Sequence, residues 1–161
     1  MTEKEALAAL REDDAARAAR AAAILWDLWS RSGRPDVDTL LGEGVDALQK
    51  RDLRGADATF SRIIALAPEF AEGWNKRATT RYLLQEFEAA IADCRETLSR
   101  NPHHFGALSG QGLCHTALGQ HREAIALYRR ALEVYPHLAE VRRGLSTALT
   151  EIVKANGHVH P

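Results

Sequence analysis

Aromatic residues are scarce in this sequence of 161 residues, at 6%, and the chain has only two cysteines. Abundant Ala and Leu with few aromatics favour helices over sheets, because Ala and Leu lose little side-chain entropy in a helix. Cys94 and Cys114 belong to no Cys-x-x-Cys pair or Cys/His cluster, so we expect buried thiols rather than a disulfide or redox pair. A chain of this length buries a core without such a staple.

The chain also lacks an excess of positive charge and a long apolar run. Its formal net charge is -1, which provides no basic field for a phosphate backbone. No run of about 18 apolar residues is present, and Met1–Glu5 leads into an Ala-rich stretch dotted with Arg and Asp rather than a secretory signal. We therefore expect a soluble, cytoplasmic protein that binds neither nucleic acid nor a membrane.

Signatures of enzymes and of cofactor or metal sites are missing as well. The glycines between Gly106 and Gly112 fall inside a predicted helix, not in a phosphate-binding loop after a strand. Ser109, His115 and Asp93 could be written as a triad, but nothing in the sequence positions them. The pair His103–His104 has no acidic or thiol partner at ligand spacing. We predict no catalytic residue, no cofactor and no metal site, and at most adventitious metal binding by the histidines of the C-terminal tail.

The strongest signal is an internal repeat with a period of 34 residues. Helical apolar runs each end at a proline, and prolines cannot continue a helix. In each repeat, two positions hold small residues and a third holds a bulky one. This arrangement suits two antiparallel helices that cross at close range. These positions, in order along the repeat, are Gly44, Ala78 and Gly112; Ala56, Ala90 and Ala124; Phe60, Cys94 and Tyr128; Pro68, Pro102 and Pro136. The pattern predicts a two-helix unit present three times.

This phasing, with Trp74 and the alanines and prolines above, resembles the tetratricopeptide repeat (TPR). The segments 70–78 and 104–108 also resemble small bacterial TPR proteins. The resemblance implies an all-α fold, a right-handed α-solenoid of three TPR helix pairs with an N-terminal helical extension and a C-terminal capping helix. The predicted divisions of this single domain are 1–34, N-terminal cap; 35–68, 69–102 and 103–136, the three repeats; 137–154, C-terminal helix; and 155–161, a disordered tail.

The N-terminal segment carries an apolar stripe that includes Leu25 and Trp29, with Trp26 beside it. It begins with Thr2 and Glu5, which are spaced as a helix capping box. We expect this segment to cover repeat one, the weakest copy, where Leu40 replaces the family's tryptophan. The alternative is that the two tryptophans form a dimerisation or partner-docking face.

In TPR proteins the first helices of successive repeats line a concave groove. The resemblance places these candidate partner-binding residues in it: Glu72, Asn75, Lys76, Thr79, Tyr82, Ser109, Leu113, Thr116 and Arg143. Tyr82 comes one residue later than the family's aromatic, a rotation of about 100 degrees that should turn it toward the groove. The positions of the family's carboxylate clamp hold Leu41, Val45, Lys76, Gly106 and Gly110. Only lysine can hold an anion, so capture of a chaperone C-terminus is disfavoured.

We therefore predict a non-catalytic scaffold that binds a peptide or protein segment in the groove. One alternative is a self-assembling homodimer, through the Trp-bearing segment or through the groove. A weaker alternative is an accessory subunit of an enzyme or metal-dependent complex, with the histidines as its point of attachment. The sequence names no partner for any of the three.

Overall fold

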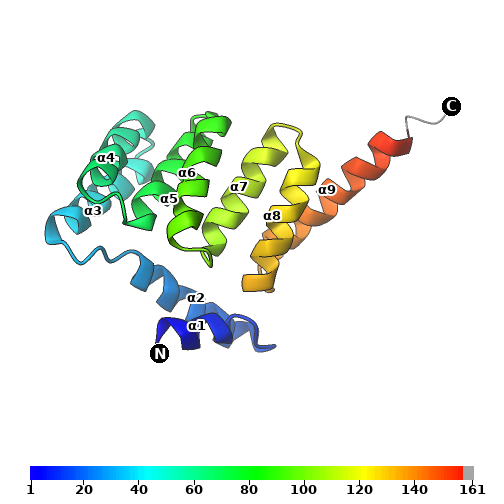
Figure 1. Cartoon of the computed structure of the whole chain (residues 1–161), viewed down its shortest axis with the longest axis horizontal. Helices are drawn as coiled ribbons and strands as arrows, with labels where there is room; N and C mark the ends of the chain where they lie inside the picture. The colour runs from blue at the N-terminus through cyan, green and yellow to red at the C-terminus, as the bar shows by residue number, and fades with distance from the viewer. Residues whose placement is uncertain (158–161) are drawn as a thin grey trace.

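The structure, a computed structural model, describes residues 1–157 and consists there of nine α-helices (Figure 1). Their bounds are α1 Glu3–Ala9, α2 Ala15–Trp29, α3 Pro35–Gln49, α4 Leu53–Leu66, α5 Ala71–Leu83, α6 Phe87–Arg100, α7 Phe105–Ala117, α8 His121–Val134 and α9 Ala139–Gly157. The all-helical architecture predicted from the sequence is confirmed.

Helices α3 to α8 form three pairs that stand side by side in a row (Figure 1). Helix α3 contacts α5, α5 contacts α7 and α7 contacts α9, whereas α4, α6 and α8 contact one another less within residues 1–157. The first helices of the pairs are therefore the more closely packed layer, and they form the inner side of the curved stack.

The turn inside each pair repeats a left-handed backbone conformation. Arg51, Gln85 and Gly119 lie 34 residues apart, with φ angles of 63°, 62° and 73°. Only one of them is glycine, the residue that adopts this conformation without a steric cost. The tertiary arrangement thus imposes the same turn on three different side chains.

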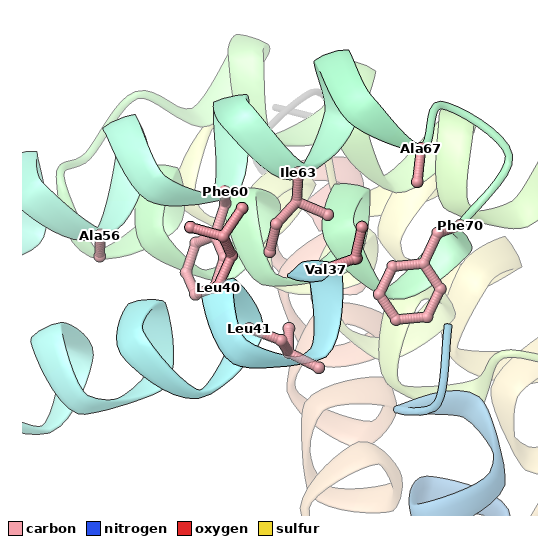
Figure 2. Close-up of a cluster of buried hydrophobic side chains, with 8 residues drawn as sticks. All are labelled: Val37, Leu40, Leu41, Ala56, Phe60, Ile63, Ala67 and Phe70. Carbon is pink, nitrogen blue, oxygen red and sulfur yellow. The ribbon is translucent and has the colours of Figure 1, made fainter. Parts of the chain in front are cut away.

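Small residues set the distance between paired helices, as the repeat predicted. A Cβ atom added at Gly112 of α7 would lie 2.5 Å from Tyr128 Cε1 of α8, and one added at Gly44 of α3 would collide with the ring of Phe60 of α4. Phe60 also belongs to the core of the first pair, whose side chains from α3 and α4 face one another in Figure 2. A side chain at either glycine would push the two helices apart.

The N-terminal segment differs from the expectation. Thr2 and Glu5 do form the capping box, but the segment folds as two helices, with a second start at Asp14, whose carboxylate accepts from the amides of Ala16 and Arg17. These helices run along the edge of the row formed by the turns between repeats (Figure 1) and pack on α7 and on the α8–α9 turn.

The prediction that this segment covers repeat one is therefore wrong. The physical reason lies in α3, which has a fully polar exposed stripe and needs no apolar cover. The residues of that stripe are Asp36, Thr39, Glu43 and Asp46. The aromatic and apolar surface that can bury two indoles lies at repeat three, around Phe105, Tyr135 and Leu138.

The C-terminal helix closes the row and is longer than predicted. Helix α9 continues to Gly157, so Ala155 and Asn156 are helical rather than part of a tail. Val141 and Ala148 are buried against the preceding pair, whereas Leu149 and Val153 remain exposed. The rest of the predicted tail, including the expected metal-binding histidines, lies outside the described residues.

Candidate functional site

A pocket of about 200 Å³ opens between α5 and α7 on the inner layer of the stack. Helix α5 supplies one wall and α7 the other, and Cys94 of α6 reaches it from behind. Its lining is mostly apolar. The residues that line it are Asn75, Ala78, Thr79, Tyr82, Cys94, Gly106, Ser109, Gly110, Leu113 and Cys114.

Small residues make this pocket possible. Gly106 and Gly110 lie one helical turn apart on α7, so no side chain from these two positions fills the space. A Cβ at Gly110 would approach only Cys94 Sγ, at 3.8 Å. Tyr82 forms the opposite wall and is fixed by edge contact with Phe87, at 5.7 Å between ring centroids.

The polar groups at the rim are already engaged within the chain. Thr79 Oγ1 donates to the carbonyl of Asn75 at 3.2 Å, and Ser109 Oγ donates to the carbonyl of Phe105 at 2.7 Å. The Asn75 amide donates to Glu72 Oε1 at 3.0 Å. A ligand side chain entering this pocket therefore meets apolar surface and hydroxyl oxygens that can still accept a hydrogen bond.

Two free thiols stand at the back of the pocket, as buried cysteines. Burial raises the pKa of the Cys94 thiol well above its ordinary range, with smaller contributions from the nearby Cys114 and Asp93. Burial also raises the pKa of Cys114 to about 11. Both groups stay protonated at neutral pH and act as apolar lining rather than as nucleophiles.

The hollow continues past this pocket toward α9. A second space of about 360 Å³ shares Gly106 and Ser109 with the first and is bounded by Trp26 of α2 and by the start of α9, including Glu140. The two spaces together make a groove whose floor is α7. We call the surface formed by these two adjoining spaces the α7 groove.

At the start of α5, two residues predicted to bind a partner are instead engaged inside the chain. Glu72 was expected to face the groove, but it is fully buried, with its Oε2 atom 2.9 Å from Nε2 of the equally buried His104. Lys76 Nζ lies 3.7 Å from Glu72 Oε1 and 5.7 Å from the centre of the Trp26 ring. The charge of Lys76 is therefore largely satisfied inside the chain.

The remaining predicted residues divide into two groups. Leu113 lines the α7 groove and is 45% exposed. Thr116 instead hydrogen-bonds Tyr128 Oη at 2.9 Å, in contact with the core between α7 and α8. Arg143 is exposed on α9 and lines neither space of the groove.

The predicted dimer or cap face is used within the chain. Leu25 is fully buried, and Trp26 and Trp29 both lie against His104 and Phe105. A second chain can reach Leu25 only after α2 has left its place.

Sequence reasoning missed His104 and the role of Trp26 as a wall of the groove. Glu72 and His104 lie 32 residues apart, and no local spacing pairs them. A partial signal existed, because the 34-residue repeat predicts that the start of α7, where His104 lies, packs beside the start of α5, where Glu72 lies. Trp26 left no such signal, since it lies outside the repeated region.

The residues considered for catalysis do not come together. Asp93 is paired with Arg77 and Arg81, His115 bonds Gln120, and Ser109 donates to its own helix. Within residues 1–157 no group of three His, Cys, Asp or Glu side chains could hold a metal ion. None of the helices in this part of the chain is both long and apolar enough to cross a bilayer.

Comparison with protein families shows what this helical stack is. Tetratricopeptide repeat patterns match residues 41–102 and 106–138, which together make up more than half of the chain. The chain belongs to the tetratricopeptide-repeat family. This TPR chain is 29% identical to a TPR repeat-containing protein of Rhizobium etli over 126 residues, 78% of this chain and 62% of the relative. It is 25% identical to human DnaJ homolog subfamily C member 7 over 142 residues, 88% of this chain and 28% of that protein.

Solved TPR domains share the fold. The Sgt2 TPR domain of Aspergillus fumigatus superposes with a TM-score of 0.75 and 23% identity, covering 80% of this chain and 86% of that one. The first TPR of Spaghetti (RPAP3), bound to the HSP90 peptide SRMEEVD, superposes with a TM-score of 0.72 and 22% identity, covering 73% of this chain and 93% of that one. The chain spans less than two thirds of the length of the two curated relatives.

Proposed function

We propose that this TPR chain is a non-catalytic scaffold that holds a segment of a partner protein in the α7 groove. The observation that carries the proposal is the groove itself, two adjoining hollows of about 200 and 360 Å³ that share Gly106 and Ser109 in their lining. Gly110 of α7, where an added Cβ would meet only Cys94 Sγ at 3.8 Å, allows a ligand backbone to approach closely, and Leu113 with Tyr82 provides apolar contact beside it. The related RPAP3 domain in complex with an HSP90 peptide supports a peptide ligand as the general class.

The ligand that fits this groove is an extended segment with an apolar side chain rather than an acidic chain end. At the family's clamp positions Leu41, Val45, Gly106 and Gly110 offer no cationic donor. The fifth position, Lys76, is already paired with Glu72 and covered by Trp26. A peptide carboxylate would have to compete with Glu72 for the one remaining cation.

We also propose a reducing, cytoplasmic setting. Cys94 and Cys114 are both free and buried, as expected for a chain that relies on its packed core rather than on a disulfide.

Site-specific photo-crosslinking tests the groove directly. A photoreactive amino acid is placed at Leu113 of the full chain, and the cross-linked proteins are identified by mass spectrometry in the native cell. The matched control carries the same amino acid at Leu149, a leucine of similar exposure (45% and 40%) that lies on α9 outside the groove. We expect a partner that is captured from Leu113 and not from Leu149.

A purified segment of the captured partner then gives the affinity. Replacing Leu113 by Asp should weaken its binding at least ~10-fold, since a buried charge opposes an apolar contact, and Leu149→Asp should leave it unchanged. Equal capture at the two positions, or equal loss of affinity in the two variants, would show that the groove is not the site.

A further inference from the structure

Helix α2 lies on the start of α7 through two indoles three residues apart. The Trp29 ring stacks on His104, with centroids 4.8 Å apart and an angle of 27° between the planes. Trp26 meets His104 edge-on at 5.1 Å and Phe105 at 5.5 Å. Aromatic pairs of this kind contribute beyond the area they bury, and such residues dominate the affinity of many interfaces.

The surface beneath the indoles is shaped for them. A Cβ atom at Gly106 would lie 2.5 Å from Trp26 Cη2, so the missing side chain leaves the space that the indole occupies. Below the rings is the Glu72–His104 pair, fully buried, which needs an apolar cover to stay out of water. Tyr135 and Leu138, at the α8–α9 turn, extend the apolar surface under α1 and α2.

Helices α1 and α2 pack on each other and together form one unit that lies on the surface of the repeats. Leu10 and Leu25 are fully buried between the two helices and the surface below. Trp29 Nε1 donates to Glu3 Oε1 at 2.9 Å, which links the end of α2 to the start of α1. His137 Nε2 lies 2.6 Å from the carbonyl of Glu12, so the turn between the helices is also held.

Only a short linker joins the helix pair α1–α2 to the repeats. Helix α2 ends at Trp29 and α3 begins at Pro35, and Gly33 between them is exposed, with no heavy atom near its Cβ position. The cluster around Leu25 includes no residue of α3 or α4. The contact of α2 with repeat three is therefore a docking contact between a tethered segment and a distant surface, separate from the core of repeat one.

We infer that the start of α7 and the α8–α9 turn form a docking site for an amphipathic helix with two aromatic residues three positions apart, and that α2 is its tethered occupant. A tether of this length gives an effective concentration in the millimolar range. A partner helix of the same chemistry therefore binds only when it outcompetes α2 or when α2 has been released. The inference goes beyond the peptide proposed for the α7 groove, but the two sites adjoin, because Trp26 is a wall of that groove and both sites include Phe105 and Leu138.

A cleavable linker tests the inference on the full chain. A protease recognition sequence is inserted after Gly33, the purified protein is cut, and the segment 1–33 is followed by size-exclusion chromatography and fluorescence anisotropy. We expect the cut segment to stay bound, with a dissociation constant on the order of 1 µM, and to be displaced by a synthetic peptide of residues 1–33. The same peptide at 10 µM should not bind the uncut chain, because the tethered copy occupies the site.

Altered peptides show whether the indoles carry the recognition. A peptide with Trp26→Ala and Trp29→Ala should compete at least ~100-fold more weakly, and one with Ala23→Gln, on the exposed side of α2, should compete as the natural sequence does. As a second measurement, the uncut chain with both Trp→Ala changes should bind the natural peptide added in trans. A cut segment that dissociates entirely at 100 µM protein overturns the inference. Equal competition by the natural and the double-Ala peptides, or failure of the uncut double variant to bind the added peptide, does so as well.

Discussion

His104 Nε2 lies 2.9 Å from Glu72 Oε2, and neither side chain is exposed to solvent. The same imidazole accepts, through Nδ1, from the amide of Ala107 at 3.1 Å and thereby caps α7. One residue thus joins the start of α7 to α5 and supports the indoles of α2. The behaviour of this residue is the most direct measure of how the N-terminal helices are held.

Replacing His104 by Ala should destabilise the protein by about 3 kcal/mol, because it leaves the buried Oε2 atom of Glu72 without its hydrogen-bond partner and removes the cap of α7. Urea unfolding followed by circular dichroism measures this loss. The neighbouring His103 is exposed and provides the control, with an expected change within about 0.5 kcal/mol for His103→Ala. Similar losses in the two variants would mean that the buried pair contributes nothing particular to stability.

Two glycines of α3 should respond to Ala in opposite directions. Gly44→Ala forces a methyl group into the ring of Phe60 and should cost about 1–3 kcal/mol. Gly42 has no neighbour at its Cβ position and is exposed, so Gly42→Ala should stabilise the helix by about 0.5–1 kcal/mol. Thermal unfolding of both variants beside the parent chain provides the comparison. A Gly44→Ala variant as stable as the parent would show that α3 and α4 can separate without cost.

The repeated left-handed turn provides a second pair of opposite changes. Gln85 has a φ of 62°, which costs a residue with a Cβ about 1–2 kcal/mol, so Gln85→Gly should stabilise by about 0.5–1 kcal/mol. Gly119 occupies the equivalent position of the next pair, and Gly119→Ala should destabilise by about 1 kcal/mol. The denaturant concentration at the midpoint of unfolding measures the stability change in each variant. If the two changes shift the midpoint in the same direction, the turn geometry does not control their effect.

The pocket thiols should be unreactive while the chain is folded. With a pKa of about 11 for Cys114 and a still higher one for Cys94, roughly one thiol in a thousand or fewer is ionised at pH 8. Iodoacetamide labelling read by mass spectrometry should therefore modify both cysteines quickly in guanidinium and scarcely at all without it. Rapid labelling of the folded chain at either cysteine would contradict the burial of the pocket floor.

The same raised pKa values make stability depend on pH at the alkaline end. The unfolded thiol ionises near pH 9 and the folded one only at higher pH, so their contribution is complete below pH 9 and declines as pH rises from 9 toward 11. Urea midpoints at pH 8 and pH 10 test this. The decline should be smaller in Cys114→Ala, which removes one of the two groups.

The repeat made the row of helix pairs predictable. Gly44 and Gly112 were assigned to close helix contacts from their spacing alone, and the structure places them against Phe60 and Tyr128. Such contacts join a helix to the next one along the chain, so the local apolar pattern and the 34-residue period contain the information. The same phase assigns Tyr82 and Leu113 to the groove side of α5 and α7, where they line the pocket, but it also assigns Glu72 and Thr116 to that side, and these two are engaged inside the chain.

The amino-acid sequence by itself determined the helices, their pairing and their order, because each depends on residues within about one repeat of each other. The tertiary structure alone decided where the N-terminal helices go, and with them the burial of Glu72 and the shape of one end of the groove. Trp26 and His104 are 78 residues apart and follow no common period, yet they touch. The choice of surface for two indoles depends on which exposed region offers the largest apolar area and the best-shaped space, and these properties arise only once the repeats have stacked.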